Sequence, residues 1–180
     1  ELSYDFMMSE INKLSDNDLI MLSDNDEIPN LDSTQFKDSN SDIYIFKQLF
    51  FYYKFNLLYD RMYWFGSKAC TKKKLKSLSW LRNLKNKKYP LWRLDTFFSK
   101  TKSSSLKIIN DGGWHFTNVM SAENLYTKMT NFGHHDEFEL SGLSVEDLKN
   151  KINQGVVFYD HFAGQEDKNK WEFNYKLKKI

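Results

Sequence analysis

Two aspartates, Asp24 and Asp26, alternate directly after a short apolar run at residues 19–22. An apolar run of this length, bounded by polar turn-forming residues, predicts a buried strand. The carboxyl end of such a strand is where open α/β sheets bind their ligands. Carboxylates there are the hard oxygen ligands that Mg²⁺ and Mn²⁺ prefer. We therefore expect a divalent-cation site at this strand end, with a phosphate group as the second partner of the cation.

The pentapeptide that carries these aspartates, Leu-Ser-Asp-Asn-Asp, occurs twice, at residues 14–18 and 22–26. The first copy closes a helix predicted over residues 2–14, where Ser, Asp and Asn are ordinary turn formers. Only the second copy follows a predicted strand and continues into Glu-Ile-Pro, whose proline holds Ile28 extended. An EF-hand starting at Asp24 is excluded, because glycine and glutamate are missing from its sixth and twelfth positions.

A second group of candidate residues, Asn-Asp-Gly-Gly-Trp-His-Phe at 110–116, follows a strand predicted over residues 106–109. Asp111 is a potential base, Trp114 offers a flat face to a sugar ring, and His115 suits a transition metal. Two glycines allow a tight turn or a close approach to a ligand. On spacing alone, a β-turn beside a core tryptophan is an equal alternative.

Two histidines and two carboxylates follow the helix predicted over residues 122–132, which ends at a glycine. His134, His135 and Glu137 belong to this group, for which an ordinary structural role is the alternative. The other elements predicted are a short helix over 30–38, one or two strands within 43–65, a helix over 75–84, and a helix opening at 144–147 with a capping box and ending at Gly155. A final strand is predicted over 156–159.

Composition describes one soluble globular domain, since 41% of the 180 residues are hydrophobic and 28% are charged. The single cysteine, Cys70, excludes an internal disulfide and a multi-thiolate metal site. Charges interrupt the longest apolar region, residues 43–65, so we expect no transmembrane segment. Without a visible signal peptide, a cytoplasmic location is favoured. The first residue is not methionine and lies within a predicted helix, so we expect a fragment of a longer protein.

Charge is unevenly distributed along the chain. Residues 1–42 carry 11 acidic and 2 basic side chains, whereas residues 68–102 carry 12 basic and 1 acidic. The acidic stretch is consistent with a cation site. The basic stretch suits a diphosphate, an acidic glycan, a membrane surface or nucleic acid, or it is simply a solvated face.

Taken together, Ser-Asp-Asn-Asp-Glu-Ile-Pro at 23–29 and Gly-Trp-His-Phe at 113–116 resemble glycosyltransferase family 17. This is the family of the β-1,4-mannosyl-glycoprotein 4-β-N-acetylglucosaminyltransferase. The resemblance covers residues 1–160 and extends through 132–138 and 152–155. It implies an α/β, GT-A-like fold, a mixed sheet flanked by helices, over residues 1–165 with a charged tail at 166–180. Much of the N-terminal nucleotide-binding half of that fold is expected to be absent from this chain.

The resemblance also implies a reaction: inverting, metal-dependent transfer of N-acetylglucosamine from UDP-GlcNAc to a glycan or glycoprotein acceptor, with Mn²⁺ or Mg²⁺ as cofactor. Asp26 would bind the metal directly, Asp24 would reach the ribose or the metal through water, and His115 would complete the metal shell. Asp111 and Glu137 are the alternative catalytic bases, and Asp136 precedes Glu137 where the family pattern has an uncharged residue. The remaining donor- or acceptor-binding candidates are Ser23, Asn25, Glu27, Gly112, Gly113, Trp114, His134 and His135. A eukaryotic secretory member would act in the Golgi lumen.

Two other functions compete with this one. A lectin-like or scaffold domain would keep the fold without turnover. A nucleic-acid-binding module would use the basic stretch with Trp80, Tyr89 and Trp92. The glycosyltransferase interpretation predicts no nucleic-acid partner.

Overall fold

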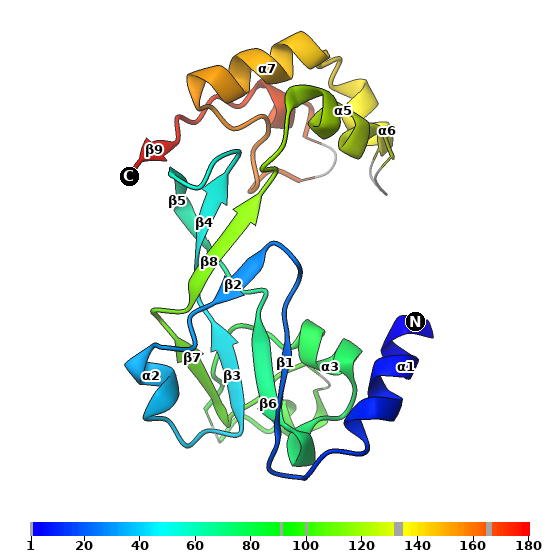
Figure 1. Cartoon of the computed structure of the whole chain (residues 1–180), viewed down its shortest axis with the longest axis vertical. Helices are drawn as coiled ribbons and strands as arrows, with labels where there is room; N and C mark the ends of the chain where they lie inside the picture. Colours follow the sequence, from blue (N-terminus) through cyan, green and yellow to red (C-terminus); the bar gives the residue numbers. More distant parts are fainter. Residues whose placement is uncertain (1, 91, 100, 132–134, 165–166) are drawn as a thin grey trace. The chain divides into compact units, whose positions relative to one another are not determined.

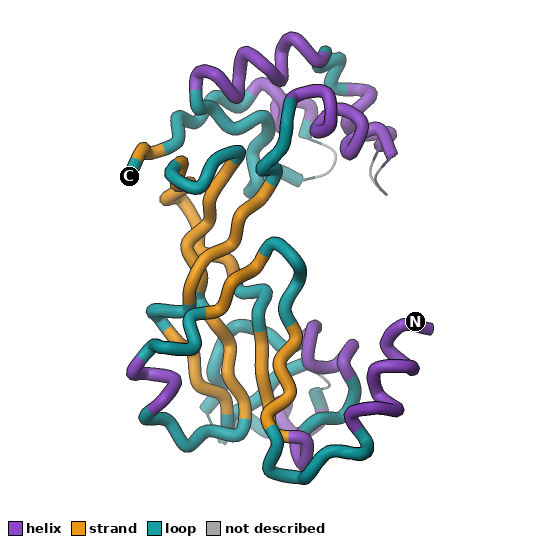
Figure 2. Tube along the Cα trace, in the orientation of Figure 1, coloured by secondary structure: helices purple, strands orange, loops and turns teal. Residues whose placement is uncertain are grey.

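The computed structural model describes residues 2–90, 92–99, 101–131, 135–164 and 167–180 (Figures 1 and 2). It contains two β-sheets with flanking helices, so the α/β class expected from the sequence is confirmed. The chain divides into two compact units. Unit 1 comprises Glu1–Leu49 and Tyr63–His115, and unit 2 comprises Phe50–Met62 and Phe116–Ile180.

Unit 1 is built on a four-stranded mixed sheet of order β1-β6-β3-β7. Its strands are β1 (Leu19–Leu22), β6 (Lys68–Thr71), β3 (Ile43–Phe46) and β7 (Leu106–Ile109). β6 is antiparallel to both β1 and β3, and β3 is parallel to β7. β1, β3 and β7 therefore run in the same direction. Their carboxyl ends, which lead into residues 23–26, 47–48 and 110–112, meet at one edge of the sheet.

The core of unit 1 surrounds β3, which is buried at all of its positions because both faces of the sheet are covered. Alternate side chains of a strand point to opposite faces. Ile43 and Ile45 join one cluster, which includes Leu81 of α3 (Leu78–Asn83). Tyr44 and Phe46 join the other, against which Phe36 of α2 (Thr34–Lys37) packs. Figure 1 shows these two helices on either side of the sheet.

Two lysines of unit 1 cap helix ends, where carbonyl groups lack partners within the helix. Lys72, in η1 (Lys72–Lys74), donates to the carbonyl oxygens of Asn12 and Leu14, just after α1 (Leu2–Ile11). Buried Lys68 donates to the carbonyls of Arg82 and Leu84 at the end of α3. Burial lowers the pKa of Lys68 to about 8, against the opposing effect of the Glu27 charge. Unit 1 also contains α4 (Asp95–Phe98) and β2 (Glu27–Pro29).

The second sheet has the order β2-β8-β4-β5-β9. Its longer strands are β8 (Gly113–Thr117), β4 (Gln48–Tyr52) and β5 (Leu57–Trp64), each of which has residues in both units. In unit 2, β5 pairs with β9 (Lys178–Lys179).

The helices of unit 2 are α5 (Ala122–Asn131), α6 (His135–Leu140), α7 (Val145–Gln154) and η2 (Lys168–Glu172), and α5 packs on both α6 and α7. The predicted capping box of α7 is confirmed, with Ser144 and Asp147 bonding each other's backbone N–H groups. Gly155 ends α7 in the left-handed conformation, as expected. The core of unit 2 is aromatic, and the Tyr52 hydroxyl lies 2.9 Å from His161 Nε2.

Several element boundaries differ from the sequence prediction. Residues 43–65 form three strands rather than one or two, and α2 and α3 are shorter than predicted. The strand predicted over 156–159 is wrong: Val156 makes only an isolated bridge with Lys176. That segment is instead a turn whose apolar side chains, including those of Val157 and Phe158, fill the core. Within the described part of the chain, no helix is long and apolar enough to cross a membrane.

Candidate functional site

The acidic turn between β1 and β2 is organised by the buried side chain of Glu27, which is 6% exposed. Its carboxylate accepts hydrogen bonds from Trp64 Nε1 at 2.6 Å, Ser67 Oγ at 3.0 Å and the backbone N–H of Asp24 at 3.1 Å. Charge-assisted bonds of this kind offset the cost of burying a carboxylate. Glu27 was expected among the donor- or acceptor-binding residues. In the structure its carboxylate instead bonds to the protein and stabilises the turn.

A second layer of contacts fixes the start of the turn. The Ser23 and Ser67 hydroxyls lie 2.7 Å apart, and Gln48 Nε2 donates to Ser67 Oγ at 3.1 Å. Gly66 is required beside them, because a Cβ at this position would lie 1.5 Å from the Glu27 carboxylate. Sequence reasoning missed these partners, since a Gly-Ser dipeptide and a lone glutamine carry no pattern that points to Glu27.

Asp24 forms a two-pronged ion pair with Arg82 from the end of α3. The two guanidinium nitrogens donate to its carboxylate oxygens at 3.0 and 2.9 Å, and Arg82 also donates to the Tyr4 hydroxyl. Both partners are about half exposed, so the pair contributes at most about 1 kcal/mol to stability. The only signal for Arg82 in the sequence was its membership of the basic stretch.

Asp26 lies beside His115, the pairing expected of two metal ligands. The register of β2 and β8 sets Glu27 opposite His115, so the imidazole enters the interior and is 5% exposed. The Trp64 ring stacks on it, with ring centroids 4.5 Å apart. His115 Nδ1 lies 3.7 Å from Asp26 Oδ1. Two ligands of one ion, each bound at about 2.1 Å, lie at most about 4.2 Å apart, so this spacing fits a shared cation.

The described residues contain no group of three or more His, Cys, Asp or Glu side chains arranged to hold a metal ion. Among the described residues, Asp26 and His115 therefore form a pair of potential ligands that no third His, Cys, Asp or Glu joins, because Asp24 is directed to Arg82. Asn25 is exposed on the same turn. A cation here would need its remaining ligands from a bound phosphate or from water.

Trp114 points away from this cluster. It pairs in register with Ile28 on the opposite face of the β2–β8 ribbon from Glu27 and His115. Ile28 is 51% exposed and Trp114 is 39% exposed. The two side chains form an exposed apolar surface of the kind on which a sugar ring can stack, but not on the face that carries Asp26 and His115.

The glycines of the second motif allow close packing of the chain on itself. A Cβ on Gly112 would lie 2.4 Å from the backbone nitrogen of Lys47. Gly113 has φ +102°, and a Cβ there would lie 2.1 Å from the Ile28 carbonyl oxygen. Their contacts in the structure are therefore with backbone, which accounts for both residues without a ligand.

The two candidate bases belong to different units. Asp111 is exposed in unit 1, where its carboxylate accepts from Asn30 Nδ2 at 2.9 Å. Glu137 lies on α6 of unit 2 and forms an ion pair with Lys170 at 2.9 Å. His135 Nε2 lies 2.9 Å from Asp136, and His134 falls outside the described residues. Only Asp111 shares a unit with the acidic turn.

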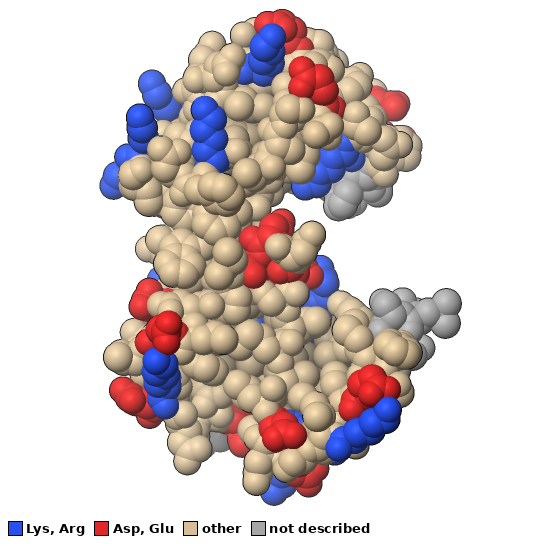
Figure 3. Space-filling model, viewed as in Figure 1, with Lys and Arg blue, Asp and Glu red and all other residues tan. Residues whose placement is uncertain are grey.

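The oppositely charged stretches of the sequence partly offset each other within unit 1. Ion pairs join Arg82 to Asp24 at 2.9 Å, Lys74 to Asp42 at 3.4 Å, and Lys72 to Asp16 at 3.9 Å. Figure 3 shows acidic and basic side chains interspersed over the visible face. This pairing weakens the single-sign field that nucleic-acid binding by the basic stretch would require.

No family model, curated protein or solved structure matches this chain. The two segments that principally carry the resemblance to a glycosyltransferase family are residues 23–29 and 113–116. In the structure these two segments pair as neighbouring strands β2 and β8.

Proposed function

We propose that this chain is part of a metal-dependent glycosyltransferase with a GT-A-like fold, which transfers N-acetylglucosamine from UDP-GlcNAc to a glycan acceptor by inversion. The observation that carries the proposal is the 3.7 Å approach of Asp26 to His115, next to the carboxyl ends of β1, β3 and β7. Ligands of open α/β sheets bind at such an edge. The two motifs that suggested the family supply one member each to this pair.

Mn²⁺ or Mg²⁺, when bound, would neutralise charge that develops on the departing diphosphate. Asp26 and His115 would hold the cation. Glu27 fixes the turn that carries Asp26, and Trp64 fixes the plane of the His115 ring. Arg82 is joined to the same turn through Asp24, where its planar guanidinium is suited to a diphosphate oxygen.

The acceptor hydroxyl must lose a proton to a base within hydrogen-bond reach. Asp111 is the better candidate of the two, because it is exposed, lies in unit 1 and is oriented by Asn30. Glu137 remains the alternative. Trp114 and Ile28 lie on the other face of the β2–β8 ribbon from His115, so they would pack against a sugar ring of the acceptor that is remote from the metal pair.

The repeated pentapeptide provides a matched control for testing this proposal. UDP-GlcNAc and UDP are titrated calorimetrically into the protein with and without Mn²⁺. The same titrations are made on Asp24→Asn/Asp26→Asn and, as control, on Asp16→Asn/Asp18→Asn. We expect Mn²⁺-dependent binding that weakens at least tenfold, or about 1.4 kcal/mol, in the second-copy variant alone. An affinity that does not depend on Mn²⁺, or that decreases equally in both variants, would refute the donor site.

A non-catalytic glycan-binding scaffold is the second candidate, and the two-pronged Asp24–Arg82 pair favours it because that pair occupies a carboxylate of the motif. The two candidates differ in turnover. Release of UDP from UDP-GlcNAc in the presence of Mn²⁺ and glycan acceptors supports the transferase. Glycan binding without UDP release, measured on the same sample, supports the scaffold.

A further inference from the structure

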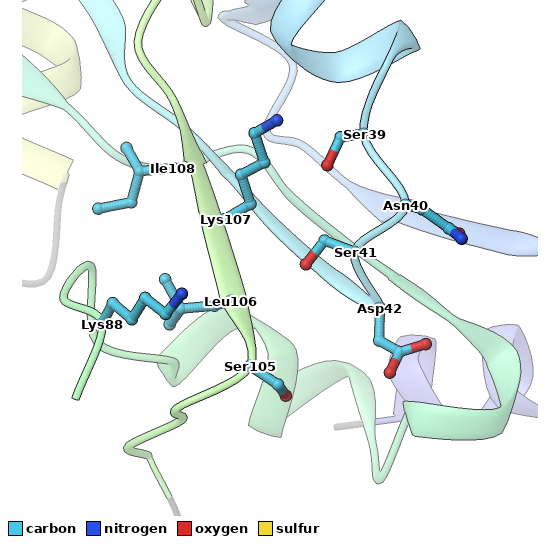
Figure 4. A pocket seen from close by; sticks show the side chains of 9 residues that line it. All are labelled: Ser39, Asn40, Ser41, Asp42, Lys88, Ser105, Leu106, Lys107 and Ile108. Atoms are coloured by element: carbon cyan, nitrogen blue, oxygen red, sulfur yellow. The ribbon is translucent and has the colours of Figure 1, made fainter. Parts of the chain in front are cut away.

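Unit 1 contains a separate pocket of about 670 Å³, lined by residues 39–42, Lys88 and residues 105–108 (Figure 4). Apart from Lys88, these residues lie before β3, before β7 and within β7. The pocket is thus at the amino-terminal ends of the parallel strands, whereas the acidic turn is at their carboxyl ends. Strands of four residues separate the two edges by about 13 Å, at a rise of about 3.3 Å per residue.

One wall of the pocket is held in place by a buried tyrosine. The Tyr44 hydroxyl donates to the Ser39 carbonyl at 3.0 Å and accepts from the Ser41 backbone N–H at 2.9 Å. Tyr44 is itself anchored in the core, against Phe36. The segment that carries both serines is therefore preorganised, which lowers the entropic cost of binding a ligand there.

Two lysines supply positive charge to the pocket. Lys107 lies opposite Tyr44 in the β3–β7 register, and Figure 4 shows it extending toward the side on which the Ser39 and Ser41 hydroxyls lie. Lys88 is positioned by a backbone bridge to Ser103, and in Figure 4 it lies beside Leu106, on the other side of β7 from Lys107. The pocket also contains Asp42, whose charge is partly offset by Lys74 at 3.4 Å. Lysine ammonium groups bind phosphate as point charges.

We propose that this pocket binds a sugar phosphate, meaning a phosphomonoester on a small polyhydroxylated ring. Lys107 supplies positive charge for the phosphate, and the Ser39 hydroxyl can donate to a phosphate oxygen. The Ser41 hydroxyl donates to the Ile43 carbonyl at 3.2 Å, so its oxygen offers an acceptor to the ligand. Lys88 adds a second positive charge from the other side of β7. Asn40 and Asp42 provide acceptors for ring hydroxyls. The volume falls in the range of small-molecule sites and leaves room for a ring beyond the phosphate. The proposal does not depend on the glycosyltransferase assignment.

Glucose 6-phosphate is a suitable probe, measured by calorimetry at about 0.15 M salt, where surface charges more than about 8 Å apart are screened. We expect saturable binding that weakens at least tenfold in Lys88→Gln/Lys107→Gln. The matched control, Lys73→Gln/Lys85→Gln, removes the same charge from exposed lysines outside the pocket and should change the dissociation constant less than about twofold. Thermal melts of both variants confirm that each is folded.

Three further titrations distinguish a sugar-phosphate site in this pocket from binding elsewhere on the protein. Inorganic phosphate should compete, and glucose should bind much more weakly than glucose 6-phosphate. Asp24→Asn/Asp26→Asn should bind the probe as the unaltered protein does. The proposal is overturned by the absence of saturable binding at about 10 mM probe, by equal losses in the two lysine variants, or by loss of binding in the aspartate variant. If inorganic phosphate bound as tightly as the sugar phosphate, the sugar ring would contribute nothing to binding, and the proposal of a sugar-phosphate site would be overturned.

Discussion

Residues 14–18 and 22–26 have the same sequence, Leu-Ser-Asp-Asn-Asp, and the structure gives them different partners. In the first copy, Asp18 accepts from the backbone N–H of Ser15 at 2.8 Å, and the turn is exposed. In the second, Asp24 pairs with Arg82 and Asp26 approaches His115. In the first copy, the Asp18 side chain bonds locally and Asp16 comes only within 3.9 Å of Lys72. In the second copy, both aspartates contact residues far away in the sequence, and one of them, His115, is buried.

The residue that follows each copy accounts for much of this difference. The first copy is followed by Leu19, which begins β1, and the second by Glu27, which is buried among Trp64 and Ser67. Identical polar residues therefore become a solvated turn or a fixed one according to what the next side chain can bond. Substitutions in and around the two turns test that contrast, beginning with the largest expected effect.

Replacing Glu27 should have the largest effect on stability. Glu27→Ala would remove the carboxylate that accepts from the part-buried indole N–H of Trp64 and from the Ser67 hydroxyl, which we expect to lower the free energy of unfolding by about 3 kcal/mol. Asp18→Ala, in the first copy, should cost only about 0.5 kcal/mol. Urea denaturation followed by tryptophan fluorescence measures both. Equal losses would show that the second turn is no more fixed than the first.

Gly66→Ala should disturb the second turn by crowding Glu27 rather than by removing it. The added methyl would overlap the Glu27 carboxylate, and overpacking of this kind costs about 2 kcal/mol. Gly164→Ala is the matched control, because a Cβ there meets no atom within 4 Å. Thermal denaturation of the two variants should separate them clearly. A Gly66→Ala protein as stable as its control would mean that Glu27 moves without cost.

Lys68, which pairs in register with Leu22 at the start of the second copy, should make stability depend on pH. Its pKa is lowered to about 8 by burial, so the unfolded chain holds its proton to a higher pH than the folded one. Burial of the Lys68 charge therefore destabilises the folded protein fully below about pH 8. This destabilisation decreases as the pH rises toward the unfolded pKa of about 10.4, so the free energy of unfolding increases with pH over that range.

The comparison for this prediction is Lys68→Met. The free energy of unfolding of the unaltered protein, relative to this variant, should rise by on the order of 1 kcal/mol between about pH 8 and 9.5. Denaturation at a series of pH values provides the measurement. A difference that stays constant, or that falls with pH, would contradict a lowered pKa.

Arg82→Gln should have the smallest effect on stability, about 0.5 kcal/mol or less, because its pair with Asp24 is half exposed. It should nevertheless strengthen Mn²⁺ binding about threefold, since it removes a positive charge beside two carboxylates. Arg93→Gln serves as control, because it breaks a different surface ion pair, the one between Arg93 and Asp95. Calorimetric titration with Mn²⁺ measures both, and a weaker affinity in Arg82→Gln would show that Arg82 orients Asp24 for the cation.

The amino-acid sequence was sufficient for features that depend on neighbours a few residues away. The apolar runs of β1 and β7 predicted strands, the cap residues of α7 predicted its start and end, and the acidic turn was placed correctly after β1. Patterns of period two and caps three residues apart are local, so one stretch of chain contains all the information they need.

Only the tertiary structure decided which side chains meet. Strand register set His115 beside Glu27 and turned Trp114 to the other face, and the fold brought Arg82 to Asp24 across 58 positions of sequence. It also separated Asp111 from Glu137 into different units. A shift of one residue in register exchanges the faces of a strand, and local patterns do not specify pairing between distant strands. For that reason the chemistry of the turn was visible in the sequence and its partners were not.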